Sequence, residues 1–264
     1  MKIYVICDLE GVAGVVDHRL QCWFDGGYYH QARRLATLEL NALVEGALQA
    51  GATEVVAWDG HGGFPGGLDV ELLHPECQVV LGAGDGGPAG LDSSFDAVFL
   101  LGLHSMAGTA RAVLGHSFMP GIVRCWINDL PVGEIGMNCA VAGQFGVPTV
   151  FISGDRAAVI EARALIPDIE GVAVKEGLAS EARGLAQAPT LSLAPQKARE
   201  LIRDAAKRAV IRAATVAPFR IEPPYRVRTQ FVEPKYADER ANHPNVKRID
   251  ATTIEVEGMD LLSI

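Results

Sequence analysis

KIYVICDLEG, residues 2–11, opens the chain with an apolar run that ends in two carboxylates. An amphipathic stretch follows at about 28–50, ended by Gly51, and a second apolar run, TEVVAW, occupies 53–58. Short apolar runs predict strands, and the longer stretch with helical periodicity between them predicts a helix. The order strand, helix, strand is that of a βαβ unit, in which the two strands are parallel.

Further apolar runs predict that this unit extends into a larger sheet. Runs rich in Val, Ile, Leu and Phe suit strands covered on both faces, which favours the α/β class with a mostly parallel sheet flanked by helices. The predicted strands are QVVLG (78–82), DAVFLLGLH (96–104), the pair RCWIN and PVGE around Asp129, and PTVFIS (148–153), with a helix at 135–146.

The second part of the chain has a different pattern, and we expect it to form a smaller α+β C-terminal lobe. This pattern predicts an α/β domain over 1–155 and the smaller lobe over 156–264. The expected elements of the lobe are a helix at about 157–165, a long charged helix at about 195–214, and extended segments at 216–234 and 247–257.

Composition and charge limit the classes of partner. The net charge is −9, and residues 1–155 hold 6 Lys and Arg against 17 Asp and Glu. Nucleic-acid binders need a basic surface, so we expect no nucleic-acid partner. A membrane span needs roughly 18–20 apolar residues. The longest run here is AVFLLGL at 97–103, so no membrane partner is expected either.

The cysteines and the N-terminus predict a cytoplasmic protein. An odd number of cysteines with no CxxC pair indicates neither a disulfide framework nor a thiolate zinc site. Asp8 and Glu10 interrupt the N-terminal apolar run before it could serve as a secretion signal. The five cysteines are Cys7, Cys22, Cys77, Cys125 and Cys139.

Side chains that bind metals follow four of the predicted strands. Taken singly, a carboxylate after a strand is usually a turn or cap residue, and a lone histidine is usually structural. In open α/β sheets, however, ligand sites lie beyond the carboxyl ends of the strands, so these side chains are expected to converge. They are Asp8 and Glu10 after the first run, His61 after TEVVAW, His104 at the end of 96–104, and Glu134 at the end of PVGE.

Two histidines and three carboxylates form a nitrogen and oxygen ligand set. Such a set suits zinc first, with manganese or cobalt as alternatives. Five ligands are too many for one tetrahedral catalytic zinc, so we expect two Zn²⁺ per chain, with one shared carboxylate and open positions for water and substrate. Residues 1–155 would then be the metal-binding catalytic domain.

Five motifs, in this order, resemble the DppA-type zinc D-aminopeptidases of peptidase family M55. They are CDLEGVAG (7–14), DGHGG (59–63), GLHSMAG (102–108), GHSF (115–118) and INDLPVGEIGMNCAVAGQFGVP (127–148). The segment around His61 departs from the family pattern, because glycines stand where serine is expected beside the histidine. The resemblance implies that Asp8 bridges two zinc ions, that Glu10 with His61 completes one site and His104 with Glu134 the other, and that His116 is the catalytic histidine.

The same resemblance implies an activity and an assembly. The expected activity is that of a zinc-dependent aminopeptidase, which hydrolyses the N-terminal residue, a D-amino acid such as D-Ala, from short peptides by metal-activated water. The expected assembly is a homo-oligomer, a decamer of two stacked pentamers. Another binuclear metal-dependent amidohydrolase or a phosphoesterase would share the ligands and differ only in the pocket, so this alternative stays open.

Other motifs have simpler interpretations. Gly82 to Gly87 fits the dinucleotide pattern GxGxxG, but Pro88 follows where a helix should open, and no acidic residue lies about 20 positions on. We therefore predict a flexible glycine-rich loop. A serine hydrolase is disfavoured because no GxSxG sequence occurs. Structural roles are predicted for His18, His30, His74 and His243.

Overall fold

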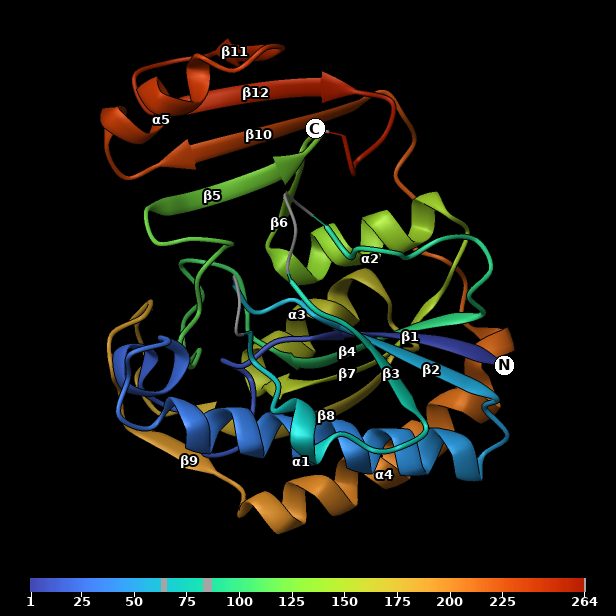
Figure 1. Cartoon of the computed structure of the whole chain (residues 1–264). Helices are drawn as coiled ribbons and strands as arrows, with labels where there is room; N and C mark the ends of the chain where they lie inside the picture. Colours follow the sequence, from blue (N-terminus) through green and yellow to red (C-terminus); the bar gives the residue numbers. More distant parts are fainter. Residues whose placement is uncertain (63–65, 83–86, 264) are drawn as a thin grey trace.

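A computed structural model of the chain describes residues 1–62, 66–82 and 87–263. The strands form two sheets (Figure 1). Sheet A has seven strands in the order β3-β2-β1-β4-β7-β8-β9, and sheet B has five in the order β11-β12-β10-β5-β6. The predicted α/β class is confirmed.

Sheet A is parallel except at one edge. All its neighbouring strands run in the same direction except β8 and β9, which are antiparallel. Its strands are β1 (Lys2–Cys7), β2 (Glu54–Asp59), β3 (Cys77–Val80), β4 (Ala97–Leu103), β7 (Thr149–Asp155), β8 (Glu170–Gly177) and β9 (Thr190–Ser192).

Helices cover both faces of sheet A. One face packs on α1 (Tyr29–Gln49) and α4 (Pro195–Arg212), and the other on α2 (Glu134–Gln144) and α3 (Arg156–Leu165) (Figure 1). This two-sided cover explains why β4 is buried at every position.

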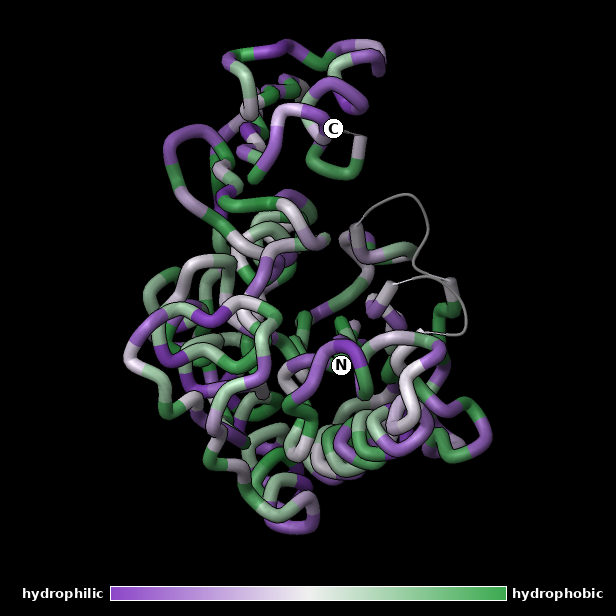
Figure 2. Tube along the Cα trace, turned by 90° about the vertical axis from the view of Figure 1, so that its left-hand side faces the viewer, coloured by the Kyte–Doolittle hydropathy of each residue, from purple (hydrophilic) through white to green (hydrophobic). Residues whose placement is uncertain are grey.

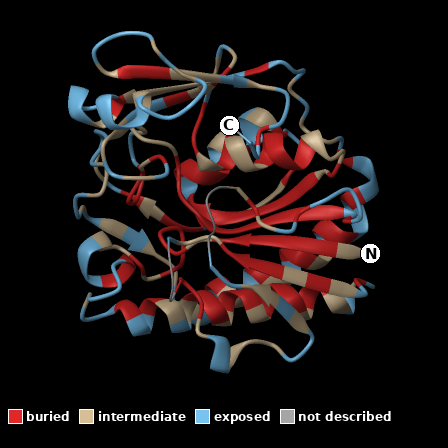
Figure 3. Ribbon diagram, turned by 45° about the horizontal axis from the view of Figure 1, so that its top comes forward, coloured by how far each residue is buried: buried red, intermediate tan, exposed pale blue. Residues whose placement is uncertain are grey.

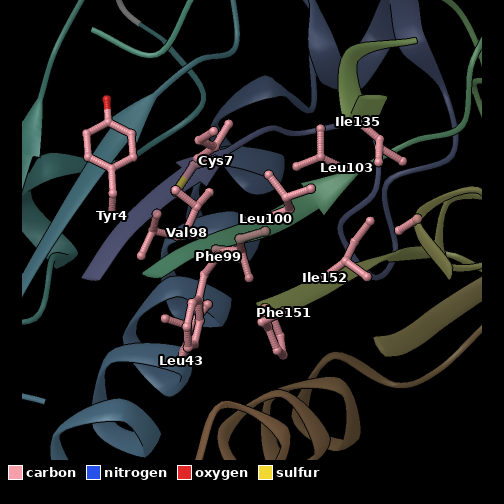
Figure 4. Packing of buried hydrophobic residues seen from close by; sticks show 14 of the residues in the cluster. Tyr4, Cys7, Leu43, Val98, Phe99, Leu100, Leu103, Ile135, Phe151 and Ile152 are labelled. Carbon is pink, nitrogen blue, oxygen red and sulfur yellow. The ribbon is translucent and has the colours of Figure 1, made fainter. Parts of the chain in front are cut away.

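The core is built on the central strands of sheet A. The rings of Phe99 and Phe151 stack with their centroids 5.3 Å apart, and Leu43 of α1 lies beside them (Figure 4). On the other face Ile135 of α2 lies near Leu103. Each such side chain stabilises the fold by about 1.5–3 kcal/mol when fully buried. The core therefore fixes the strand ends from which the site is built.

Sheet B lies beyond α2 and is antiparallel. It is less buried than sheet A (Figure 3), and both hydrophilic and hydrophobic residues occur along this lobe (Figure 2). Its strands are β5 (Ile122–Ile127), β6 (Leu130–Val132), β10 (Tyr225–Phe231), β11 (Val246–Arg248) and β12 (Thr253–Gly258), with α5 (Pro234–Ala241) beside them. Three short helical turns, η1 (His18–Cys22), η2 (Val70–Leu72) and η3 (Ala213–Thr215), complete the fold.

The predicted division at residue 155 does not coincide with a division between the sheets. Strands β8 and β9, which follow it in sequence, extend sheet A, and α4 packs against α1. Strands β5 and β6, which precede it, belong to sheet B. The assignment of two domains stays a prediction.

Two sequence features fall partly outside the described residues. Residues 83–86 of the predicted glycine-rich loop lie there, and so does Gly63 of the DGHGG motif. In the described ranges, no helix combines the length and the apolar character needed to cross a membrane.

Candidate active site

The carboxyl ends of β1, β2 and β4 lie side by side, because β1 pairs with β2 on one side and with β4 on the other. The strand order reverses between β1 and β4, and open α/β sheets bind ligands at such a point. Asp8 and Glu10 follow β1, His61 follows β2, and His104 follows β4. The order of the strands thus gathers four of the predicted ligands.

The backbone of the loop after β1 contacts the backbone at the end of β4. The N–H of Gly11 donates to the carbonyl of Gly102 at 2.7 Å. Gly102 has φ +72°, and a Cβ atom there would lie 2.3 Å from the carbonyl oxygen of Asp8. Only glycine fits this position, so Gly102 is what allows Asp8 to lie beside His104.

The five predicted ligands form a continuous set of short contacts. Nε2 of His104 lies 3.3 Å from Oδ2 of Asp8 and 3.4 Å from Oε1 of Glu134. Nε2 of His61 lies 3.3 Å from Oε1 of Glu10. Glu134 comes from the first residue of α2, where the helix N-terminus favours a carboxylate.

His116 lies against this set. Its ring stacks on that of His104, with centroids 4.0 Å apart and an interplanar angle of 11°. Its Nε2 lies 4.0 Å from Oε1 of Glu134. Ligand atoms of His104, His116 and Glu134 all lie within 4.8 Å of one another, as do those of Asp8, Glu10 and His104. His116 is therefore near enough to act on a bound substrate or to bind a metal ion itself.

The segment that carries His116 has an unusual backbone. Arg111, Leu114 and Phe118 all have φ between 57° and 59°, a region that non-glycine residues seldom adopt. Two hydrogen bonds hold it: the N–H of Val113 donates to Oδ2 of Asp155 at 2.8 Å, and the N–H of Phe118 donates to Oε1 of Glu134 at 2.6 Å. Such strain is concentrated at functional sites.

The protonation of His104 indicates that the set fits a metal. Its Nδ1 lies 3.1 Å from the carbonyl oxygen of Ser105, so Nδ1 carries a proton and Nε2 is the nitrogen available to a metal. Nε2 faces the carboxylates of Asp8 and Glu134, so either a proton on Nε2 or a metal cation must lie between these groups. Among the described residues, Asp8 Oδ2, Glu10 Oε2, His61 Nδ1 and His104 Nε2 are buried with no hydrogen-bond partner.

Comparison with known proteins assigns the family. The model of peptidase family M55, described as D-aminopeptidase, matches residues 1–264. The chain belongs to this family. Membership assigns it aminopeptidase activity on peptides and confirms the resemblance drawn from the five motifs.

Two proteins support the assignment. A D-aminopeptidase of Bacillus subtilis (strain 168) is 33% identical over 271 residues, covering 99% of this chain and 93% of that protein. The structure of the Zn-dependent D-aminopeptidase DppA from Bacillus subtilis, described as a self-compartmentalizing protease, has a TM-score of 0.90 at 31% identity. It covers 99% of this chain and 93% of that one, and the α/β arrangement of the peptidase matches it.

The charges in the peptidase site are tightly linked. Burial and the nearby Glu10 carboxylate raise the pKa of Asp8. Burial opposes protonation of His61, but the Glu10 carboxylate raises its pKa to about 9. Burial likewise opposes protonation of His104, and the carboxylates of Glu134 and Asp8 raise its pKa well above the usual range. Concentrated negative charge thus attracts cations to this point.

A cavity of about 140 Å³ is lined by four of the predicted ligands, Asp8, Glu10, His61 and Glu134, and by His116. His18, for which a structural role was predicted, lies in its wall, with Nε2 3.8 Å from Oε1 of Glu10 and its ring 6.0 Å from that of His116. The chain turns back through η1 after the loop that follows β1, which brings His18 to this wall, and its structural role stays a prediction. Phe118, the last residue of the GHSF motif, also lines the cavity, and so does Trp23, which no motif in the sequence indicated.

Lys175 of β8 holds the loop after β1, which carries Glu10, through hydrogen bonds to its backbone. Its buried ammonium group donates to the carbonyls of Glu10, Val12 and Val15. A lone lysine in an otherwise ordinary strand gives no sequence signal, so this role was not predicted.

Asp59 has a structural role although it precedes His61. Its carboxylate accepts hydrogen bonds from the N–H groups of Gly67 at 2.7 Å and Leu68 at 3.0 Å.

Proposed function

We propose that this protein is a two-zinc aminopeptidase that removes the N-terminal residue, a D-amino acid such as D-Ala, from short peptides. The observation that carries the proposal is the convergence of the five candidate ligands with four buried ligand atoms that have no hydrogen-bond partner among the described residues. Metal binding would satisfy atoms whose burial is otherwise costly. The zinc dependence of the DppA structure supports the choice of metal.

In this proposal the chain binds the metals in two groups that share Asp8. Glu10 and His61 complete one group, and His104 and Glu134 complete the other. When bound by these residues, zinc would lower the pKa of a bound water and polarise the scissile carbonyl. The backbone N–H of Phe118, which donates to Glu134, orients that ligand.

His116 transfers the proton. Its Nδ1 lies 2.9 Å from the carbonyl oxygen of Leu114, so the proton resides at Nδ1 and Nε2 faces the cavity with a lone pair. Burial and the neighbouring His104 lower the pKa of His116, which keeps Nε2 available as a base. Nε2 would accept a proton from the attacking water and donate it to the amine nitrogen as the C–N bond breaks.

The shape and charge of the site select the substrate. A cavity of about 140 Å³ admits a small N-terminal residue, and its carboxylates attract the α-ammonium group. Trp23 and Phe118 limit the access of bulk water.

Metal analysis combined with peptide hydrolysis tests the proposal. Freshly purified protein is expected to hold about two zinc ions per chain and to release D-Ala faster than L-Ala from short peptides, and a chelator should abolish the release. Two metals without peptide cleavage would point to another amidohydrolase or a phosphoesterase. Absence of metal with no rescue by added zinc would overturn the proposal.

We further propose a homo-oligomer, a decamer, located in the cytoplasm. The description of DppA as self-compartmentalizing supports the assembly, and Trp23, Phe24 and Tyr28 leave large apolar side chains exposed near the site. All five cysteines are free, which suits a reducing compartment. Sedimentation velocity of the purified protein distinguishes a decamer from smaller species.

A further inference from the structure

A second cavity, of about 550 Å³, adjoins the site between α2 and sheet B. Apolar side chains from several separate segments line it, so its interior suits an apolar group. The side chains that matter here are Phe118, Met119, Ile122, Met137, Val141 and Phe231.

Two features place this cavity next to the metal site. Phe118 lines both cavities, and its backbone N–H donates to Oε1 of Glu134. Met137 and Val141 lie three and seven residues after Glu134 in α2, and therefore on the same face of that helix. The same face of α2 therefore carries the predicted metal ligand Glu134 in its first turn, and Met137 and Val141, which line the larger cavity, one and two turns later.

The dimensions match a peptide that crosses from one cavity to the other. A peptide advances by about 3.3–3.6 Å per residue when extended, and one turn of α2 rises by about 5.4 Å. With the scissile bond beside Glu134, the residue after it reaches the level of Met137. Under the proposed function the smaller cavity, of about 140 Å³, takes the N-terminal residue, and the larger one, of about 550 Å³, has room for a bulky side chain.

We propose that the larger cavity is the subsite for the residue that follows the scissile bond, and that it takes an aliphatic or aromatic side chain. This inference rests on the proposed aminopeptidase function. It makes the preferred substrates short peptides with a small N-terminal residue and a large apolar second residue.

Three dipeptides test the subsite: D-Ala-Gly, D-Ala-Leu and D-Ala-Phe. The zinc-loaded wild type is expected to hydrolyse the Leu and Phe peptides with kcat/KM about tenfold above that for the Gly peptide. Met137→Trp fills the cavity and should bring the ratio of kcat/KM for the Leu and Phe peptides to that for D-Ala-Gly down to about one. Ile160→Trp, on the exposed side of α3, is the matched control and should keep the preference.

Comparison of the three peptides within one variant separates the outcomes. If Met137→Trp does not fold, Val141→Phe provides the same obstruction from the next turn of α2. A wild type without preference, or an equal loss for all three peptides in the filled variants, would overturn the subsite. An equal loss together with altered sedimentation would instead assign the cavity to a contact between subunits. If the wild type hydrolyses no peptide, the proposed function fails, and the subsite fails with it.

Discussion

The two sides of the site are positioned by different means. The strand-end group, Asp8, Glu10, His61 and His104, follows the central strands of sheet A directly. The loop group, His116, Phe118 and Glu134, depends on a segment with three residues at positive φ and on the connection from β6 of sheet B to α2. The first group is fixed by strand order, and the second by contacts between separate parts of the fold.

The two groups should therefore differ in how their geometry responds to amino-acid substitutions. The ends of strands that are packed in the core have little conformational freedom. Substitutions in the strand-end group should therefore reduce metal binding and activity without changing the backbone. The loop group is held by individual hydrogen bonds to Asp155 and Glu134, so its geometry can be lost while the fold persists. Four substitutions test this difference between the strand-end group and the loop group.

Asp8→Asn should have the largest effect, because it removes the carboxylate proposed to be shared by both metals. We expect the zinc content to fall by one ion or more and kcat/KM to fall by about 10⁴-fold. Elemental analysis and hydrolysis of a D-Ala peptide measure both. Asp96→Asn is the matched control, since Asp96 accepts a hydrogen bond from the N–H of Lys2 at the other end of the sheet. Full activity of Asp8→Asn would refute the ligand assignment.

His116→Ala tests the loop group. We expect kcat/KM to fall by about 10²–10³-fold, because the proton acceptor is lost. The zinc content should stay at the wild-type level if His116 moves protons, and should drop if it binds metal through its contact with Glu134. His243→Ala, on an exposed turn, serves as the control and should change neither quantity. Unchanged activity of His116→Ala would rule out its catalytic role.

The same contrast explains which parts of the site could be predicted from the sequence. The strand-end group was predictable, because apolar runs identify strands and parallel strands in an α/β sheet end at one edge. His116 was identified only through the family resemblance, since a histidine between Gly115 and Ser117 has no periodic pattern. The position of His18 in the cavity wall was not predicted, because it depends on how η1 packs against the loop after β1.

Prediction of the fold from the sequence has a similar limit. The central strands and α1 agree closely with the predicted ranges, because their periodicity is set by burial on both faces. The assembly of sheet B was not predicted, because β5, which pairs with the neighbouring β6, also pairs with β10, about a hundred residues away. No local pattern encodes a pairing at that separation.

Lys175→Met tests the strand-end group without changing a ligand side chain, because it removes the ammonium group that binds the loop carrying Glu10. The carbonyls of Glu10, Val12 and Val15 would lose their buried donor, and we expect the free energy of unfolding to fall by about 2–3 kcal/mol. Zinc affinity should also fall by about 10–100-fold. Urea unfolding and zinc titration measure these changes. Lys197→Met on the exposed face of α4 should alter stability by no more than about 0.5 kcal/mol.

The smallest effect concerns Glu39 of α1, whose Oε1 accepts a hydrogen bond from the N–H of Ala13 at 3.0 Å. Burial raises its pKa to about 7, although Lys175 and Arg199 oppose this. The unfolded pKa is near 4.3, so between that pH and 7 the folded protein holds a proton that the unfolded chain releases. Stability therefore falls as the pH rises through this window.

Glu39→Gln keeps the acceptor for Ala13 and removes the titration. Urea unfolding at pH 5 and pH 8 should then show a smaller loss of stability than in the wild type, whereas Glu45→Gln, at a partly exposed position of the same helix, should behave like the wild type. An equal pH dependence in Glu39→Gln and the wild type would mean that Glu39 is ionised in the folded protein at both pH values. In that case Lys175 would neutralise Glu39 as well as hold the Glu10 loop, and the strand-end group would rest on a buried ion pair.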